Sequence, residues 1–247
     1  LTTINIPESV VEIDEDAFAL CRGLTSFILE DGTDSLSIDN NFLDSPLKEV
    51  YLGRNIVYPE DKAPFAMLST LARLTIGKNV SNIGDGAFAG NENLLDVLSY
   101  AEAIPVTGQN AFTETYLPDA TLMVPYALFD DYLDTDPWSQ FGLVQNFEGK
   151  YRLFYVLDGE FYQKVVWDQG AVVTAEEVPA KEHYTFSGWS GLPDLMPGHD
   201  VIVTGSYIKD GSYTIYEMAQ GWNWISTNLG EQEAVSSLEF LSGIEDY

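Results

Sequence analysis

The sequence predicts a mainly β protein in which a solenoid of stacked repeats is followed by a small α+β module. Three observations support this prediction. A leucine opens a segment every 23 or 24 residues, at Leu1, Leu24, Leu47, Leu71 and Leu94. A phenylalanine recurs at the same spacing in the second half of each segment. The period stops near Tyr151, where two alternating strands around an Asp-Gly turn begin.

Each segment is predicted to contribute one strand to a sheet along one side of the solenoid. The segments begin LTTINI, LTSFIL, LKEVYL, LARLTI and LLDVLS, with apolar residues mostly at positions one, four and six. Because side chains alternate across a strand, positions four and six face the core and positions three and five face solvent. A unit of about 23 residues cannot bury its own apolar face, so neighbouring units must stack.

The recurring phenylalanines are predicted to pack between neighbouring repeats. They are Phe18, Phe42, Phe65, Phe88 and Phe112. Two of them end closely similar turns, IDEDAF and IGDGAF. A Phe that recurs in register with a repeat belongs in the core between units.

These repeats resemble the bacterial cell-surface type of leucine-rich repeat called BspA-like or Treponema-type. Its units read approximately L-x-x-I-x-I-P-x-x-V-x-x-I-x-x-x-A-F. The first segment, LTTINIPESVVEIDEDAF, matches almost position for position, and the fourth, LARLTIGKNVSNIGDGAF, nearly as well. The second and third depart from the pattern, with DGTDSLSIDNNF and NIVYPEDKAPF in their second halves. The resemblance implies a leucine-rich-repeat solenoid of about six units.

The stretch ATLMVPYALFDDYLDTDPWSQFGLVQNF, residues 120–147, resembles the unit that closes such an array. A strand is expected to end at Pro125, a short helix to run through Tyr132, and a last turn to begin at Asp136. The solenoid with its C-terminal cap is therefore predicted over residues 1–148.

A second module is predicted over residues 149–210. Strands YRLFYVL and FYQKVVW flank Asp158-Gly159, a dipeptide favoured in tight hairpin turns, and VIVTGSYI is expected as the last strand. The module resembles the β-grasp-like repeat of Listeria internalins and Bacteroides surface proteins. The residues that carry the resemblance are this hairpin, Lys181, Tyr184-Thr185-Phe186, Gly188-Trp189 and Met196-Pro197. His183 stands where that family usually has Gly.

Trp189 and residues 211–247 each carry a separate prediction. Trp189 is either a ligand-stacking aromatic or, as we expect, the large side chain that fills a small core. Residues 211–247 are predicted to be a partial C-terminal module or tail. Their Gly-Trp-Asn-Trp sequence resembles the start of a module common near the ends of Bacteroides surface proteins, and no function is attached to it.

Composition excludes several classes of partner. Against 39 Asp and Glu there are 11 Lys and Arg, a net charge of -28, so nucleic acid and anionic lipid would be repelled. Cys21 is the single cysteine, which rules out an internal disulfide and leaves the redox compartment open. No apolar run approaches the roughly 18 residues of a membrane helix. The opening LTTINIPESV lacks signal-peptide features, and its start without Met suggests a trimmed sequence.

Catalytic and metal-binding patterns are not found, and we predict no cofactor, no metal and no enzyme activity. His183 and His199 lack metal-ligand spacing, and SGWSG is not the G-x-S-x-G of acyl hydrolases. The acidic turns do not follow the calcium-loop pattern. A glycoside-acting enzyme remains a remote alternative because it needs two carboxylates, although a narrow repeat stack offers no deep cleft for them.

What remains is the solvent face of the predicted sheet. The candidate binding strip consists of Thr3, Asn5, Ser26, Ile28, Glu49, Tyr51, Arg73, Thr75, Asp96 and Leu98. Ile28, Tyr51 and Leu98 are apolar where a purely solvated face favours polar residues, either because loops cover them or because they bind a ligand. We expect an extracellular or cell-surface adhesion protein, monomeric, that binds a protein or glycan. A structural stalk without a ligand is the alternative.

Overall fold

A computed structural model describes residues 1–39, 42, 45–59 and 62–211. The described residues fall into two compact units. One contains Leu1–Val178 and Ser187–Ser206, and the other contains Pro179–Phe186 and residues 207–211. The partial module predicted for residues 211–247 lies outside the described residues, apart from Gly211.

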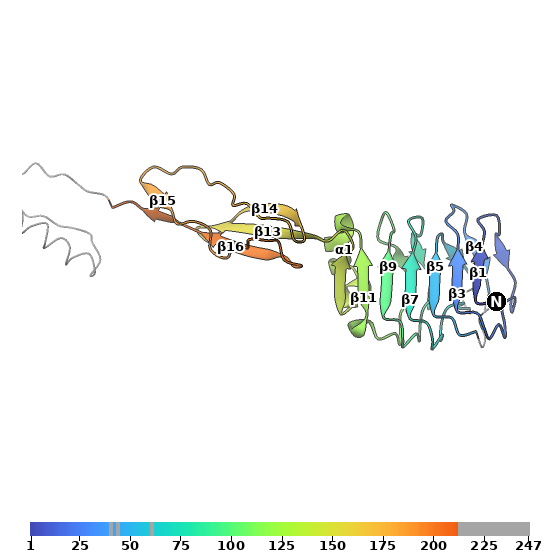
Figure 1. Ribbon diagram of the computed structural model, residues 1–247. Helices are drawn as coiled ribbons and strands as arrows, with labels where there is room; N and C mark the ends of the chain where they lie inside the picture. The colour runs from blue at the N-terminus through green and yellow to red at the C-terminus, as the bar shows by residue number, and fades with distance from the viewer. Residues whose placement is uncertain (40–41, 43–44, 60–61, 212–247) are drawn as a thin grey trace, which may run out of the picture. The chain divides into compact units, whose positions relative to one another are not determined.

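In the described part of the chain, the repeats form a seven-stranded parallel sheet (Figure 1). Its strands follow one another in sequence order: β1 (Thr3–Ile6), β3 (Ser26–Leu29), β5 (Glu49–Leu52), β7 (Arg73–Ile76), β9 (Asp96–Ser99), β11 (Thr121–Val124) and β12 (Leu143–Asn146). Every neighbouring pair is parallel, because each repeat returns the chain to the same edge before the next strand begins. The predicted repeat sheet is confirmed, and the structure shows that it is parallel.

Each of the first five repeats also carries a second short extended segment. They are β2 (Glu12–Ile13), β4 (Leu36–Ile38), β6 (Ile56–Val57), β8 (Asn82–Ile83) and β10 (Val106–Thr107). β2, β4 and β6 form one ladder, and β8 pairs with β10 in another. The second and third repeats keep this geometry although their sequences depart from the family pattern.

The predicted phenylalanine core is present as a stacked ladder. Successive rings from Phe18 to Phe112 have centroids 5.8, 5.2, 5.7 and 5.8 Å apart and nearly parallel planes. Phe65 and Phe88 are fully buried, whereas Phe18 is half-buried because it is the end of the ladder. The leucine that opens each repeat from Leu24 to Leu94 is buried as well.

Buried polar side chains that the sequence did not reveal lie beside this ladder, three residues after Phe42, Phe88 and Phe112. Asn91 is fully buried; its Nδ2 donates to the carbonyls of Phe65 and Phe88, and its Oδ1 accepts from the Leu68 amide. Thr115 donates to the Phe88 carbonyl in the same way. These side chains satisfy turn groups that would otherwise be buried without partners.

Arg54 is a second buried polar residue that sequence reasoning missed. Its side chain is completely buried, and its guanidinium donates to the carbonyl oxygens of Asp34, Pro7 and Val10 at 2.9, 3.0 and 2.7 Å. A charged group withdrawn from water needs such acceptors. Arg54 therefore ties the third repeat to the first two.

The strand, short helix and last turn predicted for residues 120–147 are present, together with two elements that were not predicted, η1 (Leu117–Asp119) and β12. After β11 come η2 (Tyr126–Leu128), α1 (Phe129–Asp134) and η3 (Trp138–Gln140), while η1 precedes the strand. Tyr132 and Trp138 are fully buried against the end of the phenylalanine ladder. The strand β12, which pairs in parallel with β11, was not predicted from the sequence.

The small module contains a three-stranded mixed sheet in the order β14-β13-β16. β13 (Lys150–Leu157) and β14 (Glu160–Asp168) form the predicted hairpin, and β16 (Val201–Gly205) pairs in parallel with β13. Asp158 and Gly159 have φ angles of 53° and 85°, as a tight hairpin turn requires. Residues 150–211 contain no helix, so the structure shows a small mixed sheet where an α+β fold was expected.

The predicted last strand VIVTGSYI is wrong as a single element, because it is divided at Ser206. β16 pairs with β13, whereas β17 (Tyr207–Lys209) pairs antiparallel with β15 (Tyr184–Phe186). The Ser206 amide donates to Ser187 Oγ at 3.0 Å, which takes it out of a strand ladder. His183, at the turn before β15, has a φ of 64°, the left-handed conformation that the usual Gly adopts readily.

Candidate binding surface

The ten residues of the candidate strip lie in two straight rows across the sheet. In the first row Thr3, Ser26, Glu49, Arg73 and Asp96 are paired in register. In the second row Asn5, Ile28, Tyr51, Thr75 and Leu98 are paired in the same way. The residues between the rows, from Phe27 to Val97, are buried in the core. The structure therefore places all ten on the open face of the sheet, and their role in binding stays a prediction.

The open face extends beyond the predicted strip. Thr121 and Leu143 continue the first row on β11 and β12, and Met123 and Gln145 continue the second. A third row follows the strand ends and contains Glu30, Gly53, Gly77, Tyr100, Pro125 and Phe147. Position seven of each repeat could have predicted the third row. Because side chains alternate along a strand, position seven lies on the same side as positions three and five.

Arg73 is held between two carboxylates of the first row. Its Nη1 lies 3.5 Å from Glu49 Oε1, and its Nη2 lies 3.2 Å from Asp96 Oδ2. All three side chains are about half exposed, and ion pairs of this kind contribute roughly 0 to 1 kcal/mol to stability. Arg73 is thus neutralised locally and adds little free positive charge to the face.

Tyr51 lies at the middle of the second row and donates its hydroxyl to Asp31 Oδ1 at 2.8 Å. Burial, followed by this hydrogen bond and the charges of Asp31 and Tyr100, raises the pKa of Tyr51 to about 12. At neutral pH the phenol therefore keeps its proton and remains a donor, and the Asp31 carboxylate stays anchored beside the sheet.

A depression of about 290 Å³ lies on this face, at β3, β5 and β7. Its lining contains six residues of the candidate strip: Ser26, Ile28, Glu49, Tyr51, Arg73 and Thr75. The predicted strip thus coincides with a hollow of the surface, which the sequence could not show because hollows depend on side-chain conformation.

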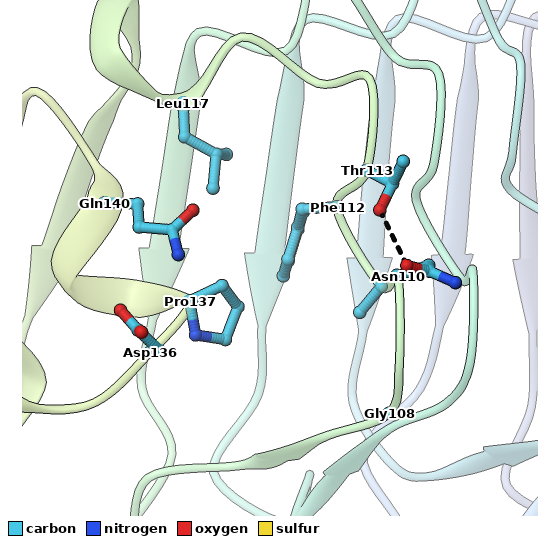
Figure 2. A pocket seen from close by; sticks show the side chains of 9 residues that line it. Gly108, Asn110, Phe112, Thr113, Leu117, Asp136, Pro137 and Gln140 are labelled. Carbon is cyan, nitrogen blue, oxygen red and sulfur yellow. Dashed lines mark hydrogen bonds between the residues drawn. The ribbon is translucent and has the colours of Figure 1, made fainter.

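A second depression of about 290 Å³ lies between the fifth repeat and the cap (Figure 2). Phe112, Leu117 and Pro137 supply its apolar lining. Asp136 is the acidic residue in this lining, and its Oδ1 accepts a hydrogen bond from Ser139 at 2.6 Å. The two facing carboxylates that a glycosidase requires do not come together there.

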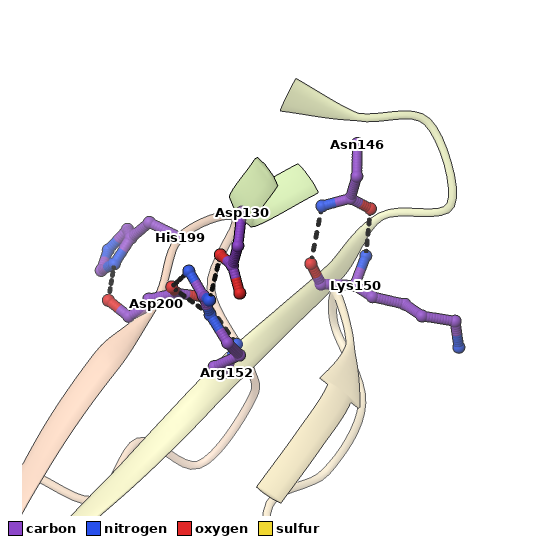
Figure 3. Close-up of polar contacts among 6 residues, drawn as sticks. All are labelled: Asp130, Asn146, Lys150, Arg152, His199 and Asp200. Carbon is purple, nitrogen blue, oxygen red and sulfur yellow. Dashed lines mark hydrogen bonds and ion pairs between the residues drawn. The ribbon is translucent and has the colours of Figure 1, made fainter. Parts of the chain in front are cut away.

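A polar cluster joins the start of β13 to the cap helix (Figure 3). Arg152 Nε donates to Asp200 Oδ2 at 2.7 Å, and its Nη1 binds Asp130 of α1. The guanidinium carbon also lies 5.5 Å from the Phe154 ring centroid and 5.8 Å from that of Phe129. Burial alone would lower the pKa of Arg152, but the bonds to Asp200 and Asp130 outweigh it and raise the pKa. These contacts connect β13 to α1 and to the residue that precedes β16.

The turn that precedes this cluster is closed by Asn146 (Figure 3). Its Oδ1 accepts from the Lys150 amide at 2.9 Å, and its Nδ2 donates to the Lys150 carbonyl at 2.8 Å. The boundary predicted at residues 148 and 149 falls within this turn, and the division into domains there stays a prediction.

Trp189 of the small module packs against Tyr155, with ring centroids 4.8 Å apart, and its Nε1 donates to the Glu176 carbonyl at 2.7 Å. This geometry supports the core interpretation of Trp189. Across the described residues, no group of three or more His, Cys, Asp or Glu is close enough together to hold a metal ion. Among the helices in the described part of the chain, none is long and apolar enough to cross a bilayer.

The repeat geometry can now be compared with known families. Residues 1–118 match the BspA type leucine rich repeat region, in 6 copies. This part of the chain consists of BspA-type leucine-rich repeats. The predicted repeat family and the predicted number of units are confirmed for these residues, while the module from residue 149 stays unidentified. A comparison with curated proteins found no match.

Proposed function

We propose that the protein is a secreted or cell-surface bacterial adhesion protein that binds a protein or glycan partner, without catalysis, through the open face of its BspA-type repeats. One observation carries the proposal: the ten predicted residues lie in register on one face, and six of them line its depression. Extended surfaces of stacked repeats are commonly used for recognition. The half-buried Ile28, Tyr51 and Leu98 supply apolar contact area on that face.

We infer that residues 149–210 serve as a spacer of the Listeria-Bacteroides type, with a β-grasp-like fold. The Asp158-Gly159 hairpin and the mixed sheet β14-β13-β16 support this inference. The proposal includes a monomeric protein that uses no cofactor and no metal.

The proposal is tested with a glycan array and an extracellular protein pull-down, using the full chain. Reproducible binding is expected; Tyr51→Ala should abolish it and Arg73→Glu should change its affinity, because these substitutions alter the floor and the charge of the depression. Tyr116→Ala and Arg22→Glu make the same chemical changes at exposed positions off the strip and should leave binding intact. Circular dichroism confirms that each variant is folded.

Absence of binding in both formats would overturn the proposal and favour the structural stalk. Binding that survives both strip substitutions would move the site to another surface.

A further inference from the structure

Two adjacent glycines leave part of the open face without side chains. Gly53 and Gly77 follow β5 and β7 in the third row and are buried. A Cβ on Gly53 would lie 2.4 Å from the Asp31 amide nitrogen, and one on Gly77 would lie 2.9 Å from Gly53 Cα. The neighbouring turns are therefore packed too closely at these two positions for any larger residue.

The Asp31 carboxylate reaches over these glycines. A Cβ on Gly77 would lie 3.0 Å from Asp31 Oδ1, and the same oxygen accepts the Tyr51 hydroxyl. We call Gly53, Gly77, Asp31 and Tyr51 the glycine patch. The patch presents an anchored, exposed carboxylate beside an aromatic ring.

The charged side chains of the three rows around the glycine patch are mostly acidic. Glu30, next in the third row, accepts a hydrogen bond from Asn5, and Glu49 and Asp96 hold Arg73 between them. Within the three rows, all of whose residues are described, Arg73 is the one basic residue. Because the whole chain carries -28, this face attracts cations and repels anions.

An apolar cluster lies on the C-terminal side of the glycine patch. Tyr100 follows β9 at the position next to Gly77 in the third row, and it is 46% exposed. Its ring centroid lies 5.1 Å from that of Phe147, which is 38% exposed. Leu98 and Met123 of the second row are half-buried beside them. Aromatic rings at the surface bind both apolar side chains and the stems of cationic ones.

We propose that the open face binds an extended peptide that places a Lys or Arg side chain at the glycine patch and an apolar side chain on the cluster of Tyr100, Phe147, Leu98 and Met123. This inference rests on the proposed function of the strip. The cation meets the Asp31 carboxylate, and its stem lies against Tyr51 and Tyr100. The negative charge of the face repels an anionic glycan and does not attract a neutral one.

The sheet also sets the spacing of the two peptide residues. Gly77 follows β7, and Met123 lies on β11, two strands further along the sheet. Neighbouring strands are about 4.8 Å apart, so the span is about 10 Å. A peptide extended in the polyproline II conformation covers about 9 Å in three residues and, with three residues per turn, places residues i and i+3 on the same side. The expected motif is a basic residue followed by an apolar one three positions later.

The probes are three fluorescent synthetic peptides of equal length in a Gly-Ser background, carrying Lys-Ser-Ser-Leu, Glu-Ser-Ser-Leu or Lys-Ser-Ser-Ser. Fluorescence anisotropy with the full chain should show that the first binds at least about tenfold more tightly than each of the other two. Its affinity should fall when salt rises from about 50 to about 500 mM, because screening weakens the exposed charges.

Matched variants locate the site. Asp31→Asn and Tyr100→Ala should each weaken the Lys-Leu peptide about tenfold. Asp134→Asn and Tyr116→Ala repeat these changes at exposed positions off the face and should leave its affinity unchanged. Asp31→Asn retains an oxygen that can accept the Tyr51 hydroxyl, so the fold is preserved.

Equal binding of the Glu and Lys peptides, or full affinity of the Lys-Leu peptide for Asp31→Asn, would overturn this inference. Glycan binding that Tyr51→Ala abolishes, together with no peptide binding, would overturn the inference and leave the proposed function standing. Absence of binding to peptides, glycans and proteins alike would remove both.

Discussion

The repeat solenoid and the small module bury apolar surface in different ways. In the described residues, the solenoid has one continuous core from Ile6 to Phe141, built from the same contacts in each repeat. The core of the module contains Leu153, Tyr155, Val173, Met196 and Val203, closed by partly buried residues such as Trp189. A repeat array therefore distributes its stability over many similar interfaces, whereas a small sheet depends on a few large side chains.

The largest expected effect concerns the solenoid. Phe88→Ala removes a fully buried ring that stacks on Phe65 and Phe112, and it should lower the free energy of unfolding by about 3 to 5 kcal/mol. Urea denaturation measures the change. Leu95→Ala, at an exposed position, is the control and should stay within about 0.5 kcal/mol. A loss below about 1 kcal/mol for Phe88→Ala would contradict the ladder.

A smaller and more local effect is expected in the module. Trp189→Ala removes the ring that packs on Tyr155 and should destabilise the module by about 2 to 4 kcal/mol, less than a fully buried Trp because the side chain is half-buried. Hydrogen exchange should accelerate in β13 and β16 and stay unchanged in β5 to β9. Phe161→Ala, exposed on β14, is the matched control. Faster exchange in both regions would show that their cores are not independent.

The smallest expected effect sharpens the account of the open face. The pKa of Tyr51 is raised from 10.0 to about 12, so its contribution to stability is fully present below pH 10 and is lost as the pH rises towards 12. An absorbance titration at alkaline pH should show one late-ionising tyrosine fewer in Tyr51→Phe. Tyr116→Phe should leave that late step in place. A late ionisation step of unchanged size in Tyr51→Phe would contradict the raised pKa of Tyr51.

The sequence predicts those features that depend on residues close together in the chain. The regular spacing of leucine and phenylalanine predicts the sheet, the ladder and the open face, because identical units have one way to bury their apolar sides. Asp158-Gly159 predicts its hairpin because few dipeptides accept positive φ at both positions. In contrast, an arginine such as Arg54 is expected at the surface. Its burial depends on backbone carbonyls of two other repeats.

The binding surface divides in the same manner. Alternation along each strand determines that Tyr51 and Arg73 share a face, since the period of a strand is two. The sequence alone does not predict that Asp31 reaches over Gly77, or that Tyr100 contacts Phe147. Both arrangements join residues from different repeats, and their distances arise only when the turns are stacked.

The sequence by itself therefore determined the repeating unit, its register and the side of the sheet on which each residue lies, because these depend on spacing within about 23 residues. Only the tertiary structure decided that the last strand divides at Ser206, which polar residues are buried, and where the open face is tightly packed, anionic or apolar. These features depend on which groups meet across the fold. The free energy of burying a polar group depends on its hydrogen-bond partners, and a single repeat does not contain those partners.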